Sequence, residues 1–176
     1  MRYLTLSLAA ALLLAAVACN NTPNTPASLL DLPPQARMVG EWQASSFTIK
    51  ATSVNGKADS NVVVTVTPND WEKKLGYQPI RTTYRADGSY EAVTRNTRDS
   101  IIATPNGKWR MMNDSTLELQ QIDPHPDTML YRVQFTALGA TFSRRYDYDK
   151  DGAKDDFFEG VQQRITPVST TPKPKN

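Results

Sequence analysis

Hydrophobic and polar residues alternate along the chain in short segments that are separated by turn signals, and this pattern predicts β-strands. Val62–Thr67 is the clearest segment, because β-branched residues fill it and Pro68 follows it. Asp87-Gly88 separates two further segments, which is typical of a tight hairpin turn. The predicted strands are Trp42–Ala51, Val62–Thr67, Ile80–Arg85, Ser89–Thr94, Gly107–Met112, Ser115–Gln120, Met129–Phe135, Ala140–Tyr148 and Phe157–Ile165.

One short helix is expected within this series of strands, with its cap at Asn69, Glu72 at the third helical position and its end at Gly76. Asn55-Gly56 predicts another hairpin turn. Strands joined by short turns pair as an antiparallel meander, and about eight or more of them must close or stack to hide their edges. We therefore predict an all-β fold, an antiparallel up-and-down β-barrel of roughly eight to ten strands. A generic antiparallel sandwich is the alternative.

The two ends of the chain differ from this strand-rich part. Residues 1–18 contain one cation, Arg2, and an apolar stretch too short for a membrane span of about 20 residues, which is the layout of a secretory signal peptide. Residues 19–36 are predicted to form a flexible tether, in which the leucines of residues 28–34 cover one end of the barrel. The barrel domain is assigned to residues 37–165, and the proline-rich residues 166–176 are expected to be disordered.

The sequence Ala16-Val17-Ala18-Cys19 resembles the lipobox of bacterial lipoproteins, with Ala16 where leucine is usual. This resemblance implies that Cys19 is acylated, carries palmitate-type chains and becomes the mature N-terminus. Acyl chains anchor a protein to a lipid bilayer, at about 0.8 kcal/mol per buried CH₂ group. Asn20 follows the cysteine, and in the resembled scheme this favours the outer membrane of the bacterial cell envelope. An ordinary signal peptide with an unpaired cysteine is the alternative.

The first and last strands carry a second resemblance. Gly40-Glu41-Trp42 opens the first strand and Arg164 closes the last, which resembles the lipocalin pattern in which an arginine stacks over the tryptophan of the barrel floor. The segments Tyr84–Tyr90, Gly107-Lys108-Trp109 and Ser115–Leu119 extend the likeness to bacterial lipocalin-like lipoproteins. The resemblance implies a β-barrel with a binding habit, and it makes Trp42 and Arg164 partners at the floor.

Composition narrows the chemistry. The chain has 20 Lys and Arg against 18 Asp and Glu, a formal net charge of +2, so it lacks the basic footprint of a nucleic-acid-binding protein. With one His and one Cys, it has neither a disulfide framework nor a Cys/His zinc cluster. Because no nucleophile–base motif appears either, we expect a protein that is not an enzyme.

The strongest chemical pattern lies between the last two predicted strands. Asp147, Asp149 and Asp151 alternate and Gly152 follows, as at positions one, three, five and six of a calcium loop. The Ala153 carbonyl and the Asp155 carboxylate would then take positions seven and nine, whereas position twelve is Phe158 rather than an acid. The sequence therefore predicts a weak Ca²⁺ site. A solvated hairpin is the alternative, with its acids offset by Arg144, Arg145, Lys150 and Lys154.

Together these patterns predict a non-catalytic, membrane-anchored envelope lipoprotein, expected to be monomeric. Its partners would be the lipid bilayer, through acylated Cys19, and a small apolar ligand or an envelope protein. A barrel of about eight strands can hold one small ligand or be filled by its own side chains. The alternative is a structural or inhibitory envelope lipoprotein that acts by protein–protein contact and has no ligand cavity.

Overall fold

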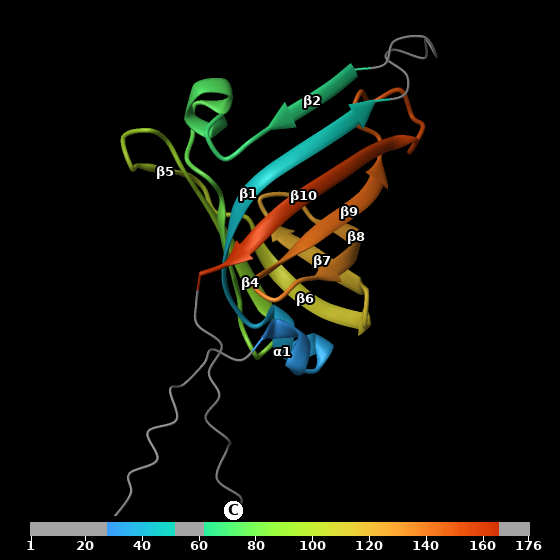
Figure 1. Ribbon diagram of the computed structural model, residues 1–176. Helices are drawn as coiled ribbons and strands as arrows, with labels where there is room; N and C mark the ends of the chain where they lie inside the picture. The colour runs from blue at the N-terminus through green and yellow to red at the C-terminus, as the bar shows by residue number, and fades with distance from the viewer. Residues whose placement is uncertain (1–27, 52–61, 166–176) are drawn as a thin grey trace, which may run out of the picture.

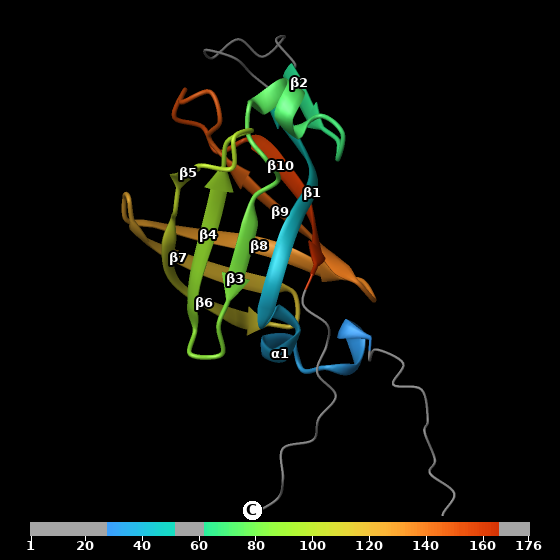
Figure 2. The same cartoon turned by 90° about the vertical axis from the view of Figure 1, so that its left-hand side faces the viewer.

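The computed structural model describes residues 28–51 and 62–165, which form a β-barrel (Figure 1 and Figure 2). Its strands are β1 (Gly40–Ala51), β2 (Val62–Val66), β3 (Arg81–Tyr84), β4 (Ser89–Arg95), β5 (Ile101–Ala103), β6 (Asn106–Asn113), β7 (Thr116–Asp123), β8 (Asp127–Phe135), β9 (Gly139–Tyr146) and β10 (Asp156–Arg164). Eight of them form a ring in the order β1-β3-β4-β6-β7-β8-β9-β10, which β10 closes by pairing with β1. The predicted all-β, up-and-down barrel is confirmed, and closure of the ring excludes the sandwich.

Short turns make consecutive strands neighbours in the barrel. Between β3 and β4, a carboxylate oxygen of Asp87 accepts hydrogen bonds from the backbone N–H of Ser89 at 2.8 Å and from its hydroxyl at 2.6 Å. Gly88 adopts a φ of +78°, which glycine tolerates without steric cost. Between β6 and β7, the side-chain oxygen of Asn113 accepts a hydrogen bond from the Ser115 N–H at 2.9 Å. These turns pair each strand antiparallel with the next one.

The long strand β1 has twelve residues and contacts three other strands. One edge pairs with β10 from Trp42 to Lys50, with a register shift between Ala44 and Ser46. The other edge is divided, because its first part pairs with β3 and the part from Phe47 onward pairs with β2. The strand β2 therefore extends the wall beyond the ring at the end of the barrel where β1 finishes (Figure 1).

The segment that precedes β1 covers the opposite end of the barrel. It contains the turn η1 (Leu29–Asp31) and the short helix α1 (Pro34–Met38), which lies below the barrel in Figure 1. Leu29 is 1% exposed and Met38 is 0% exposed, and both belong to the hydrophobic core with Trp42. The Leu29 N–H also donates to the Ala137 carbonyl at 3.3 Å. Of the three leucines expected to cover this end, Leu29 is buried in the core, whereas Leu30 is 49% exposed.

The helical segment η2 (Trp71–Leu75) links β2 to β3. Its cap residue is Asp70, so the predicted cap at Asn69 is wrong by one position. The Asp70 side chain makes no cap hydrogen bond; its carboxylate instead accepts hydrogen bonds from Thr67, through the backbone N–H at 3.0 Å and the hydroxyl at 2.6 Å. Gly76 ends the segment in the left-handed conformation, with a φ of +74°, as predicted.

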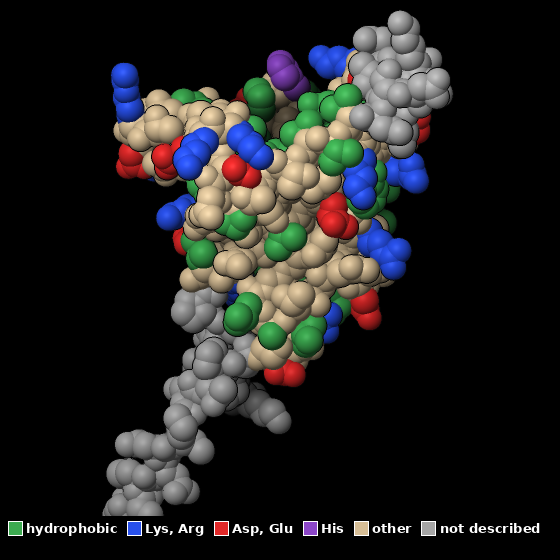
Figure 3. Space-filling view, turned by 45° about the horizontal axis from the view of Figure 1, so that its top comes forward, with side chains coloured by type: hydrophobic (Ala, Val, Ile, Leu, Met, Phe, Trp, Pro, Cys, Tyr) green, Lys and Arg blue, Asp and Glu red, His purple; other side chains and the backbone are tan. Residues whose placement is uncertain are grey.

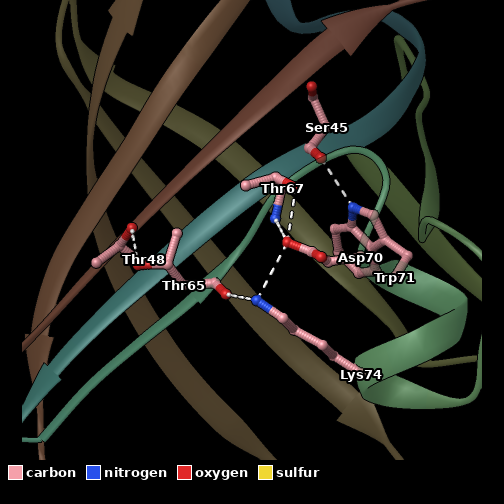
Figure 4. Close-up of polar contacts among 7 residues, drawn as sticks. All are labelled: Ser45, Thr48, Thr65, Thr67, Asp70, Trp71 and Lys74. Atoms are coloured by element: carbon pink, nitrogen blue, oxygen red, sulfur yellow. Dashed lines mark hydrogen bonds and ion pairs between the residues drawn. The ribbon is translucent and has the colours of Figure 1, made fainter.

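Polar contacts attach η2 to the strands beside it (Figure 4). The indole Nε1 of Trp71 donates a hydrogen bond to the Ser45 carbonyl of β1 at 2.8 Å, at the register shift of that strand. Lys74 reaches back to β2, where its Nζ donates to the Thr65 carbonyl at 3.1 Å and lies 3.2 Å from the Asp70 carboxylate. The segment is therefore fixed against both β1 and β2.

Some predicted features lie outside the described residues: the signal peptide, Cys19, the Asn55-Gly56 turn and the tail from residue 166. One described strand, β5, is not predicted by the sequence pattern. It has three residues, all exposed, and pairs only with β4, so hydrophobic alternation gives no signal for it.

Candidate functional site

A cavity of about 250 Å³ occupies the interior of the barrel. It reaches toward the end opposite α1, because Pro105 precedes β6 and Gln121 lies near the end of β7. Figure 3 shows that end turned forward, with hydrophobic side chains gathered beside the histidine. The lining is mostly aromatic and aliphatic, with a few polar groups: Thr82, Tyr84, Tyr90, Ala92, Pro105, Leu119, Gln121, Met129, Tyr131, Phe142, Phe158, Gly160 and Gln162.

Strand alternation explains which residues line this cavity. Alternate side chains of a strand point to the same face, and in a barrel one face is the interior. β10 contributes three such positions, Phe158, Gly160 and Gln162. A β-carbon at Gly160 would lie 2.7 Å from the Phe158 ring, so the glycine leaves room for that ring to lie across the strand. The shape of the cavity therefore depends on the absence of a side chain at Gly160 as well as on the apolar side chains that line it.

A row of aromatic rings leads from η2 to the cavity wall. Trp71 contacts Phe47 of β1, with 5.5 Å between ring centroids, and Phe47 stacks on Phe158 at 6.2 Å. Phe158 in turn contacts Tyr131 of β8 edge-to-face at 6.3 Å. Such pairs each contribute about 0.5–1.5 kcal/mol beyond their area of burial. The row gives the upper part of the cavity a rigid apolar wall.

Arg144 of β9 lies next to this row. Its guanidinium carbon is 5.2 Å from the centroid of the Tyr131 ring and 4.8 Å from that of Tyr146, so the cation contacts two aromatic faces. Burial raises the pKa of the Tyr131 phenol, and burial together with Tyr148 raises that of Tyr146 to about 12; the charge of Arg144 opposes both shifts. Both phenols are therefore neutral at physiological pH, and Arg144 supplies the positive charge here.

The predicted floor residues lie at the closed end of the barrel. Trp42 is 0% exposed, and its indole Nε1 donates a hydrogen bond to the Met38 carbonyl at 2.8 Å. Arg164 is the register partner of Trp42 across β1 and β10, and its guanidinium packs against Gly40. Burial lowers the pKa of Arg164. Among the described residues, the cation–π contacts belong to Arg37 and Arg144, so stacking of Arg164 on Trp42 stays a prediction.

The acidic loop between β9 and β10 brings the first three predicted calcium ligands together. Carboxylate oxygens of Asp147, Asp149 and Asp151 all lie within 4.8 Å of one another. The Asp147 carboxylate accepts hydrogen bonds from the backbone N–H groups of Asp151 at 3.1 Å and Gly152 at 3.0 Å. The backbone curls around this side chain, and Gly152 adopts a φ of +95°. Oxygen ligands in this arrangement suit Ca²⁺.

The rest of the predicted ligand set is arranged differently. Asp155 is not part of the group of three carboxylates; its Oδ1 is buried without a hydrogen-bond partner, and its carbonyl accepts a hydrogen bond from Arg145 at 2.9 Å. For Ala153, the described contact is a hydrogen bond from its N–H to the Asp151 carboxylate at 2.8 Å. Asp156 is fully buried and accepts a hydrogen bond from the Tyr148 N–H, so it fastens the loop to the start of β10. The calcium site stays a prediction.

Sequence reasoning missed the position of Arg144. The solvated-hairpin interpretation counts it among the cations that offset the acids, whereas the structure places it against Tyr131 and Tyr146. The alternation of side chains along β9 indicates this position, because Arg144 lies two residues after Phe142 and therefore on the same face of the strand, and the Phe142 side chain lines the cavity.

Comparisons with known proteins add no assignment: no protein-family model matches the chain, and no curated protein matches it. In the part of the chain that the structure describes, no helix is both long and apolar enough to cross a membrane.

Proposed function

We propose that this protein is a non-catalytic, membrane-anchored lipoprotein of the bacterial cell envelope whose barrel binds a small apolar ligand. The observation that carries the proposal is the cavity of about 250 Å³ inside the closed barrel. Most of its lining side chains are aromatic or aliphatic, and three are uncharged polar residues, Thr82, Gln121 and Gln162. Ligand sites are mostly apolar concavities with a few polar groups that fix orientation.

The size of the cavity bounds the ligand. Its volume of about 250 Å³ is slightly below the range of ~300–1,000 Å³ that is usual for drug-sized ligands. At ~30 Å³ for a group the size of a water molecule, it has room for about eight such groups. A short acyl chain or a single substituted ring fits this limit, whereas a long lipid chain would have to extend out of the barrel.

The anchoring part of the proposal is supported by the sequence before the barrel. The apolar stretch and the lipobox-like Ala16-Val17-Ala18-Cys19 precede a mostly polar, proline-containing segment, residues 20–27. Such a segment acts as a spacer between an acylated cysteine and a folded domain. A lipocalin-like domain held at the membrane surface could take up an apolar ligand that has little solubility in water.

The test is isothermal titration calorimetry of the purified protein with 1-octanol, an uncharged probe with eight carbons. Ala92→Phe places a ring in the cavity from β4, and Val93→Phe is the matched control, because the next residue on a strand points to the opposite face. We expect the wild type and Val93→Phe to bind octanol and Ala92→Phe to bind it at least about tenfold more weakly, a difference of about 1.4 kcal/mol.

Two outcomes contradict the proposal. If no octanol binding is detectable in the wild type, the interior is side-chain packing, and the structural or inhibitory alternative replaces ligand binding. If both phenylalanine variants lose binding equally, octanol binds elsewhere on the protein. Circular dichroism melting of the three proteins checks that each of them is folded.

A further inference from the structure

Arg144 is a charged residue on an inward-facing position of the barrel. Along β9, Ala140 and Phe142 are buried at 2% and 3% exposure, and Arg144 follows on the same face of the strand. Its guanidinium lies between the rings of Tyr131 and Tyr146. Contact with two aromatic faces restricts the orientation of a planar guanidinium, so little freedom is left to lose when it binds a ligand.

The hydrogen-bonding capacity of this guanidinium is not used within the described residues. The ion pairs there are formed by Lys74, Arg85, Arg95 and Arg110. The contacts described for Arg144 are to ring faces, which leave the five N–H donors at the edge of the guanidinium available. A fixed, half-buried fork of donors matches the two oxygens of a carboxylate.

The apolar cavity lies next to the groove that contains this cation. Met129 lines both the cavity of about 250 Å³ and a groove of about 430 Å³ at the rim, and Arg144 and Tyr146 line that groove. The charged side chains of the groove are those of Arg144, Arg145, Lys154, Asp127 and Asp147, three cations against two acids. An apolar body in the cavity would therefore place its polar end beside Arg144.

From the position of the cavity beside this groove we infer that the ligand is a compact apolar carboxylate: its hydrocarbon part fills the barrel cavity, and its carboxylate accepts hydrogen bonds from Arg144 at the rim. The inference rests on the proposed function and specifies the chemical class of the ligand. Tyr131 contributes to both parts, since it lines the cavity and also contacts the guanidinium.

The experiment compares sodium octanoate with 1-octanol at pH 7.5, where a carboxylic acid with a pKa of about 4–5 is ionised. The two probes have the same chain length and differ in the head group. Calorimetric titrations are made with the wild type, Arg144→Gln, Arg144→Lys and the control Arg132→Gln, which removes an exposed cation of β8 that lines neither the cavity nor the groove.

We expect the wild type and Arg132→Gln to bind octanoate at least about tenfold more tightly than octanol, and Arg144→Gln to lose this preference while its affinity for octanol is unchanged. Arg144→Lys keeps the charge without the bidentate fork, so it should retain part of the preference. Thermal melting of each variant identifies any that fails to fold; if Arg144→Gln does so, the comparison of Arg144→Lys with the wild type carries the test.

The inference is overturned if wild-type protein binds octanoate no more tightly than octanol, or if Arg132→Gln removes the preference as completely as Arg144→Gln. In either case octanol binding still supports the proposed function. If neither probe binds to the wild type, the proposed function fails together with the inference.

Discussion

The guanidinium of Arg164 lies against the backbone of Gly40. Its Nε and Nη2 atoms stand 2.9 Å from the position that a β-carbon on residue 40 would take. Gly40 also has a φ of +135°, a conformation that residues with side chains rarely adopt. The strand that opens the barrel therefore begins at a glycine for two independent reasons, its backbone conformation and its contact with the strand that closes the barrel.

A substitution at this glycine separates the two reasons. We expect Gly40→Ala to destabilise the protein by more than the about 1–3 kcal/mol that backbone strain alone costs, because the new methyl group also meets Arg164. The matched control is Gly40→Ala in the Arg164→Ala background, which keeps the φ of +135° and removes the guanidinium that the methyl group would meet. Urea unfolding measures both. In the double variant the two effects should be less than additive; a loss of stability from Gly40→Ala that is the same with Arg164 and with alanine at that position would contradict the contact.

Asp70 predicts a feature of the acid unfolding of the protein. Hydrogen bonds from the Thr67 hydroxyl and N–H and from Lys74 lower the pKa of Asp70 from 3.8 to about 2. Because the pKa is lower in the folded state, the ionised form stabilises the protein above about pH 4, and this contribution is lost as the pH falls to about 2. Urea midpoints of the wild type should therefore fall more steeply over this interval than those of Asp70→Asn. Parallel curves would contradict the prediction.

The acidic loop predicts a response to calcium. Binding to the folded state alone raises the free energy of unfolding by RT ln(1 + [L]/Kd), about 1.4 kcal/mol at ten times Kd. Calcium at up to ~10 mM should raise the melting temperature of the wild type, and a chelator should reverse the rise. Asp149→Asn should remove the response, and Asp114→Asn, in the β6–β7 turn, should leave it intact. A wild-type melting temperature that is indifferent to calcium leaves the solvated hairpin as the interpretation.

Cys19 predicts covalent lipidation. Metabolic labelling with a tagged fatty acid should mark the wild type, because the thiol of the lipobox cysteine is the site that is acylated in the proteins it resembles. Cys19→Ser should not be labelled, although it should be produced with the same barrel. Labelling that survives the substitution would end the assignment of a lipid anchor at this residue.

Much of the barrel could be predicted because its signals are local. Val62–Thr67 and the Asp87-Gly88 turn each specify structure within a few residues of themselves, and β2 and the β3–β4 hairpin lie where these signals put them. The cap of η2 shows the limit of this approach. Asn and Asp are both common cap residues, so the local sequence does not distinguish Asn69 from Asp70, and the Asp70 carboxylate contacts Thr67 and Lys74 rather than capping the segment.

The cavity could not be predicted in the same way, because it depends on which face of each strand is the interior. Asp147, Asp149 and Asp151 are close in sequence, so their convergence could be anticipated from spacing. Arg144 is different, since its environment is made by Tyr131 on another strand as well as by Tyr146 on its own. From the sequence alone, an arginine in a strand of alternating residues is predicted to be exposed to solvent. The prediction changes only when the pairing of that strand with the adjacent strands is known.

The pairing of β10 with β1 has a consequence for how the chain folds. Trp42 and Arg164 are register partners although about 120 residues separate them, whereas the next most distant pair of the ring, β1 with β3, joins Gly40 to Tyr84, about 44 residues apart. Such a long-range contact carries a larger loop-closure entropy, and contacts of this kind slow folding. A chain that is synthesised from its N-terminus therefore cannot close the ring until its last strand, β10, has been made. Until then the edge of β1 that pairs with β10 has no partner strand. Closure of the barrel therefore waits for the segment from Asp156 to Arg164.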